Sequence, residues 1–88
     1  MKRVIKVRQV HIDRGVKKCV RSCPIALAMY ESGLNDPLVC DETVSWYVGD
    51  QRSVNFPTPK CARAFIEQFD QGSQVDPFEF TVEDAATA

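Results

Sequence analysis

Long apolar runs are absent from this 88-residue chain, whose longest apolar segment is PIALAMY at residues 24–30. A bilayer-spanning helix needs about 20 apolar residues, so we expect no membrane segment and no membrane partner. The first ten residues have neither the apolar core nor the small-residue cleavage site of a secretory signal, which predicts a cytoplasmic protein. At this length we expect one domain over residues 1–82, followed by a flexible acidic tail at residues 83–88.

Catalytic side chains are also scarce, because His11 is the only histidine. Cys23 precedes an expected helix and follows several basic residues, and both features lower the pKa of a thiol. A cysteine–histidine pair would still need His11 as the base and a group such as Asp13 to orient it. No oxyanion donors can be identified in the sequence. We therefore expect no enzyme and no cofactor, with Cys23 acting as a small packed residue.

Metal ligation has partial support from the four cysteines. Cys19 and Cys23 have a C-x3-C spacing that lies within the range of structural zinc sites. His11, Cys40 or Cys61 would have to complete the tetrahedral set. However, no second closely spaced cysteine pair follows, and Cys61 falls on the expected buried stripe of a helix. A zinc-stabilised module is thus an alternative, and reduced structural thiols are the main expectation.

The N-terminal third predicts a strand and a short helical turn. Residues 2–8 alternate so that Ile5 and Val7 face the helices, while the opposite face is basic. HIDRG at residues 11–15 predicts a helical turn that Gly15 ends in the left-handed conformation. The segment between this turn and the next helix is a basic loop.

An apolar helix is predicted from Pro24 to the glycine at position 33. Ser22 or Cys23 is placed to cap it, and Pro24 fills the first helical position, where a missing N–H costs nothing. Gly33 ends the helix. The NDP sequence at residues 35–37 then predicts a turn.

The second half predicts a hairpin, a helix and a last strand. Residues 43–56 form the hairpin, with Val44 and Trp46 on its buried face. Thr58 is placed to cap the next helix, which Gly72 ends. The buried stripe of that helix is expected to contain Cys61, Ala62, Phe65, Ile66 and Phe69, and residues 77–82 form the last strand.

The resulting order is strand, helix, strand, strand, helix, strand. This order predicts the α+β class, as a small antiparallel sheet with two helices on one face in the ferredoxin-like, split βαβ arrangement. A three-stranded meander with helices is the alternative if the first strand pairs differently. Either architecture hosts many unrelated activities and does not indicate function.

Charge is distributed unevenly along the chain. Residues 1–21 hold eight basic residues and one acid, whereas residues 31–88 hold three basic residues and eleven acids. This asymmetry indicates either an anionic partner or charges that neutralise one another in the fold. The acidic remainder argues against non-specific DNA binding. The candidate anion-binding residues, which surround an expected helix N-terminus, are Lys6, Arg8, Arg14, Lys17, Lys18 and Arg21.

Three segments, HIDRG, CPIALAMYES and FIEQFDQGSQVDPFEF, together resemble small proteins encoded by tailed bacteriophages. The resemblance covers about residues 9–82 and rests on the patterns HI..G, CPIALA and FI..FD.G..V.PFEF. The matching residues are explained as helix starts, helix ends and a core strand, so they carry no chemistry. What the resemblance implies is a viral protein made in an infected bacterium. Such proteins often disable a host factor or sequester a nucleotide signal used in defence.

We therefore expect a non-enzymatic accessory protein that acts by binding, with counter-defence as the context that the resemblance implies. Its ligand would be anionic, either a nucleotide or an acidic surface on a host protein. Nucleic acid is not favoured as a partner, and a homo-oligomer is expected because so small a chain has little concave surface. The alternative is a protein–protein inhibitor that uses an acidic face made of Asp41, Glu42, Asp50 and Glu79.

Overall fold

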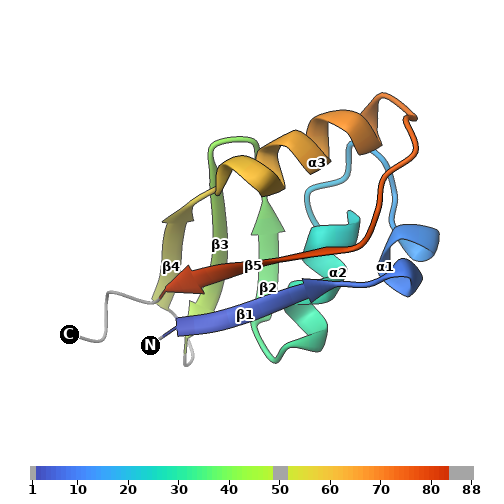
Figure 1. Cartoon of the computed structure of the whole chain (residues 1–88). Coiled ribbons are helices and arrows are strands. Elements are labelled where there is room, and N and C mark those ends of the chain that lie inside the picture. The colour runs from blue at the N-terminus through green and yellow to red at the C-terminus, as the bar shows by residue number, and fades with distance from the viewer. Residues whose placement is uncertain (1, 49–51, 84–88) are drawn as a thin grey trace.

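A computed structural model describes residues 2–48 and 52–83 of the chain (Figure 1). The expected α+β class is confirmed. Glu83, the first residue of the predicted tail, instead ends the last strand. The remaining tail residues, 84–88, lie outside the described residues, and so does Asp50 of the predicted acidic face. The elements are β1 (Lys2–Val7), α1 (Gln9–Arg14), α2 (Pro24–Glu31), β2 (Asn35–Val39), β3 (Thr43–Val48), β4 (Arg52–Pro57), α3 (Lys60–Asp70) and β5 (Phe78–Glu83).

The strands of the described residues form two antiparallel sheets. Strands β1 and β5 pair along their whole length as a terminal sheet, with Ile5 opposite Phe80. Strands β2, β3 and β4 form a meander in which each strand pairs with the next. The ferredoxin-like order is not confirmed, because residues 2–48 and 52–83 contain five strands and three helices and these strands do not form one sheet. The three-stranded meander of the alternative is present, and the first strand pairs outside it.

The predicted turn at residues 35–37 is wrong, because these residues begin β2. Asp36 has a φ of 48°, and the pairing register with β3 shifts between Asn35 and Leu38. Such a bulge lets a strand contain a proline, which cannot donate to the ladder, and aspartate tolerates the left-handed conformation. Pro37 is buried at this bulge.

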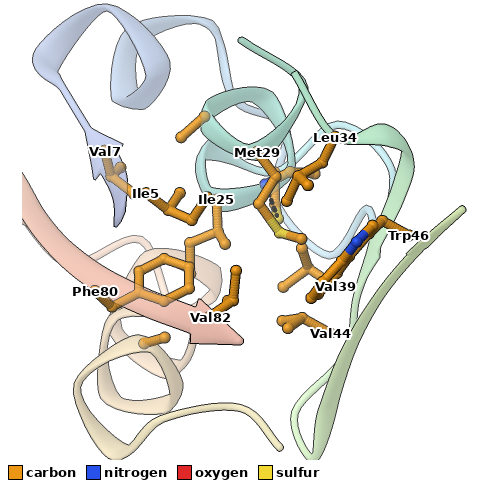
Figure 2. Close-up of a cluster of buried hydrophobic side chains, with 14 of the residues drawn as sticks. Ile5, Val7, Ile25, Met29, Leu34, Val39, Val44, Trp46, Phe80 and Val82 are labelled. Atoms are coloured by element: carbon orange, nitrogen blue, oxygen red, sulfur yellow. Dashed lines mark hydrogen bonds between the residues drawn. The ribbon is translucent and has the colours of Figure 1, made fainter. Parts of the chain in front are cut away.

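Helix α2 lies between the two sheets and supplies the centre of the core. Ile25 and Met29 are both 0% exposed. Figure 2 shows Ile25 between Ile5 and Phe80 of the terminal sheet on one side and Val39 of the meander on the other. Burying a side chain of this size contributes about 1.5–3 kcal/mol to folding. The predicted buried helix is therefore confirmed, and the structure shows in addition that it packs against both sheets.

Glycines end α2 and α3 as the sequence predicts. Gly33 and Gly72 have φ values of 100° and 84°. The N–H of Leu34 donates to the Met29 carbonyl at 3.1 Å, and that of Ser73 donates to the Gln68 carbonyl at 2.9 Å. These bonds satisfy carbonyls that the helix leaves unpaired.

The N-cap prediction is confirmed for α2 and wrong for α3. Cys23 caps α2, since its Sγ accepts the N–H of Ala26 at 3.4 Å. Pro59, not Thr58, occupies the N-cap of α3. Thr58 is buried, and its hydroxyl donates to the Cys40 carbonyl at 2.9 Å. This bond ties the start of α3 to the turn between β2 and β3.

Gly15 ends α1 for a different reason from the predicted one. Its φ of −66° lies outside the left-handed region, so the backbone does not require glycine. A Cβ at this position would lie 2.5 Å from Cγ and Cδ of Pro24. Gly15 is therefore needed because the end of α1 packs directly against the first residue of α2.

None of the helices in the described part of the chain has the length and apolar character that a bilayer-spanning helix requires.

The substitution Gly15→Ala should destabilise the protein by about 1–3 kcal/mol, since the added methyl group overpacks the contact with Pro24. Denaturant unfolding measures the change. The double variant Gly15→Ala, Pro24→Ala should recover part of the loss, because alanine lacks Cγ and Cδ. A single variant as stable as the wild type would show that this contact does not exclude a side chain.

Candidate functional site

Two of the predicted anion-binding arginines are engaged by carboxylates of the chain itself. Arg8 donates from Nη2 to Glu31 Oε1, and Arg21 donates from Nη1 to Asp36 Oδ1 at 2.9 Å. Both pairs are exposed, so each contributes little to stability, but each neutralises a cation. Arg8 and Arg21 therefore face acids from α2 and β2 that lie outside the basic segment at residues 1–21.

His11 is buried between α1 and α2, and its side chain caps the start of α1. Its Nδ1 accepts the backbone N–H of Arg8 at 2.9 Å. The other ring nitrogen, Nε2, lies 3.1 Å from Glu31 Oε2. Because Nδ1 is an acceptor, the neutral ring carries its proton on Nε2 and donates it to Glu31. The His11 side chain therefore links the start of α1 to the end of α2.

Glu31 receives hydrogen bonds from both His11 and Arg8 at the end of α2. These bonds, with that of His11 the stronger influence, lower the pKa of Glu31 below its ordinary value. The carboxylate is therefore the form that the fold stabilises.

The other predicted anion-binding residues do not gather on one surface. Lys6 lies directly opposite Glu79 across the terminal sheet. Lys17 Nζ lies beside Gly72, at the C-terminal end of α3, where a cation is favourable. Arg14 borders a hollow between α1 and α2, and Lys18 borders a different cavity, described next. The structure therefore supports neutralisation within the fold for several of the six residues.

A cavity of about 260 Å³ opens between the basic loop, the end of β2 and α3. Its floor is the core itself, since most of its apolar lining is buried. Because three cysteines line it, we call it the thiol cavity. Its lining residues are Lys18, Cys19, Val20, Cys23, Pro24, Ile25, Val39, Cys40, Asp41, Phe65, Ile66, Phe69 and Asp70.

Two hydrogen bonds between segments distant in sequence hold the basic loop, β2 and α3 together around the thiol cavity. The N–H of Val39 donates to the Val20 carbonyl at 2.9 Å, which fastens the loop to β2. The N–H of Lys18 donates to Asp70 Oδ1 at 2.9 Å, which fastens the loop to α3. Lys18 has a φ of 57°, so this contact fixes an uncommon backbone conformation. The cavity is therefore built by loop residues that the sequence presents only as a basic stretch.

The rim of the thiol cavity carries more negative than positive charge. Asp41 and Asp70 provide two carboxylates, whereas Lys18 is the one cation among the lining residues. Arg63 lies nearby, and its Nε donates to the backbone carbonyl of Asp41 at 3.2 Å. The balance disfavours an anion inside the cavity.

The cysteines are all reduced in the described residues, and three of them border the thiol cavity. Cys61 is exposed on α3, so its predicted place on the buried stripe is wrong. His11 lies between α1 and α2, away from the lining of the cavity. No group of three or more histidine, cysteine, aspartate or glutamate side chains in residues 2–48 and 52–83 is arranged to hold a metal ion. Cys19, Cys23 and His11 therefore do not converge on one metal position.

Two of the thiols in the cavity have opposite environments. The backbone N–H of Arg21 and the hydroxyl of Ser22 hydrogen-bond to Cys19 and lower its pKa. Burial raises the pKa of Cys23. The sequence shows a helix N-terminus that could lower the pKa of Cys23 but favours a packed residue there; Cys23 is buried, and burial overrides the helix N-terminus. Cys19 is the more readily ionised of the two.

The thiol cavity was missed by sequence reasoning, because its residues come from three separate segments. One signal was present: Val16 and Val20 are apolar residues in an otherwise basic loop. Both are exposed in the structure, at 53% and 42%. Only Val20 lines the cavity.

Comparison with known proteins gives no independent assignment. No family model matches the chain, and neither a curated protein nor a solved structure is found to match it. The site is therefore interpreted from its own geometry.

Glu31→Gln should lower the midpoint of thermal unfolding at neutral pH. A carboxyl whose pKa is lowered by folding stabilises the fold above its ordinary pKa, and that contribution disappears as the pH falls through the folded-state value. The difference from the wild type should therefore shrink as the pH falls below 4.5, the ordinary value for this carboxyl. Glu67→Gln, at an exposed position of α3, is the control and should change little. A pH-independent difference would contradict this role for Glu31.

Proposed function

We propose that this chain is a non-enzymatic binding protein that accepts an apolar side chain of a partner protein in the thiol cavity. The observation that carries the proposal is the combination of a buried apolar floor with exposed residues at the rim. A cavity of this kind gives an interface its central anchor, and the rim residues add specificity. The partner segment would place a basic residue beside the apolar one, to meet Asp41 and Asp70.

The size of the cavity favours a side chain over a nucleotide. Pockets for drug-sized ligands, the size class of a nucleotide, have volumes of about 300–1,000 Å³. The thiol cavity, at about 260 Å³, falls below this range. Its apolar floor also lacks the cluster of cations that a phosphate group requires.

The resemblance to small phage proteins supports a bacterial host protein as the partner. In that context, occupation of a host protein by this chain would inhibit it, and counter-defence is one use of such inhibition. The sequence also suggested a protein–protein inhibitor that binds through an acidic face. We keep that class of function, but the proposed binding surface is now the thiol cavity with its acidic rim. Asp41 belongs to both surfaces.

Val20→Asp should abolish partner binding, because a carboxylate at the rim would be buried unpaired against an apolar side chain and beside two aspartates. The expected loss is at least about tenfold in affinity, which corresponds to only 1.4 kcal/mol. The assay is recovery of host proteins on the tagged chain, quantified by mass spectrometry. Val16→Asp is the matched control in the same loop, since Val16 is exposed but lies outside the cavity. Equal recovery by the two variants would overturn the proposal.

An anionic ligand at the basic loop is the second candidate. It is favoured by the exposed side chains of Lys17 and Lys18, which take part in none of the ion pairs among the described residues. The double charge reversal Lys17→Glu, Lys18→Glu tests it and leaves Arg21 with its partner Asp36. We expect partner recovery to fall less than with Val20→Asp. The anionic ligand would be favoured if the charge reversal abolished recovery of the partner protein while Val20→Asp left that recovery at the wild-type level.

A further inference from the structure

Cys19 and Cys23 lie on one turn at the edge of the thiol cavity. The N–H of Cys23 donates to the Cys19 carbonyl at 3.0 Å, and that of Ser22 donates to the same carbonyl at 3.3 Å. This i-to-i−4 bond is that of one α-helical turn, so the Cα atoms of Cys19 and Cys23 are about 6 Å apart. Disulfides join Cα atoms about 4.4–6.8 Å apart. A Cα separation of about 6 Å falls within that range, so the turn is compatible with a bridge between the two residues.

The two thiols differ in the way that a reactive and a resolving cysteine differ. Cys19 is partly exposed, and the groups that donate to it lower its pKa and favour the nucleophilic thiolate. Cys23 is 8% exposed and its Sγ caps α2, so it is protected from direct oxidation. Reduced thiols that form a transient disulfide are the usual sensing arrangement in a reducing compartment.

We propose that Cys19 is a peroxide-sensitive thiol that forms a reversible disulfide with Cys23. The Cys19 thiolate attacks one oxygen of hydrogen peroxide, the O–O bond breaks, and the products are a Cys19 sulfenic acid and hydroxide. The Cys23 thiol then attacks the Cys19 sulfur, the S–O bond breaks, and water leaves with the thiol proton as the disulfide forms. Peroxide is reduced, and the two thiols are oxidised by two electrons.

The disulfide removes the N-cap of α2. Sγ of Cys23 accepts the Ala26 N–H in the reduced protein, and we expect the bridge to draw this sulfur toward Cys19 and away from Ala26. Ala26 then loses its cap and its amide should exchange faster with solvent. Because Cys19, Cys23 and Val20 line the same cavity, oxidation also changes the shape of the thiol cavity. The disulfide itself does not depend on the proposed binding function.

The other two cysteines are less suitable partners for Cys19. Cys61 is exposed on α3 and does not line the cavity. Cys40 lines it, but its backbone is fixed by two bonds, from its N–H to the Thr43 carbonyl and from the Thr58 hydroxyl to its own carbonyl. The turn from Cys19 to Cys23 requires no movement of β2.

The test treats the purified full chain with dilute hydrogen peroxide and measures its intact mass. We expect the loss of two hydrogen atoms and its reversal by a dithiol reductant. Cleavage after Lys18, Arg21 and Glu31 separates Cys19, Cys23 and Cys40 onto different peptides. The expected linked pair is residues 19–21 with residues 22–31. Hydrogen exchange at Ala26 should be faster in the oxidised protein than in the reduced protein.

Single substitutions decide the assignment. Cys19→Ser should abolish the bridge, and Cys23→Ser should leave a Cys19 sulfenic acid that dimedone traps. Cys61→Ser is the matched control, and the Cys19–Cys23 bridge should form in this variant at the wild-type rate. Dimedone trapping on Cys19 in the wild type covers the case in which Cys23→Ser does not fold. A bridge from Cys19 to Cys40, or modification of Cys61 at least as fast as that of Cys19, would overturn the proposal.

Discussion

Burial of α2 between the two sheets is the constraint on which the rest of the structure depends. Ile25 and Met29 of this helix are fully buried, and the helix packs against β1 of the terminal sheet and β2 of the meander. Once α2 is fixed, its first residue, Pro24, packs against Gly15 at the end of α1. Its last residue, Glu31, hydrogen-bonds to His11 of α1. The thiol cavity begins at the same helix, because Cys23, Pro24 and Ile25 form part of its wall.

Local features of the fold could be predicted from the sequence because they depend on neighbouring residues. Alternation placed Ile5, Val7, Val44 and Trp46 in the core, and glycines marked the ends of α2 and α3. The strand β2 was missed because a proline and an aspartate at positive φ look like a turn, and only pairing with β3 makes them a strand. The number of sheets was missed because the pairing of β1 and β5 depends on tertiary contacts that a pattern does not contain.

The candidate site was predictable to a smaller extent. Sequence reasoning singled out the segment around Cys19 and Cys23, and these two residues line the thiol cavity. It could not show that Asp36 would approach Arg21, that Glu31 would approach Arg8, or that burial would act against ionisation of Cys23. Each of these contacts joins residues distant in sequence. The uneven charge of the linear chain is therefore balanced in part by the fold, which brings the basic N-terminal residues to the acidic ones.

The terminal sheet has a consequence for the order in which the chain acquires structure. Ile5 and Val7 belong to the first strand, but their ladder partners lie in β5, which follows every other described element in the chain. Closure of so long a loop is entropically costly, and pairings between distant segments slow folding. The meander and the end of α2 can form from local contacts while the nascent β1 still exposes its apolar face. During synthesis, β1 therefore stays without its partner until β5 has left the ribosome, and its apolar face is open to mispairing over that interval.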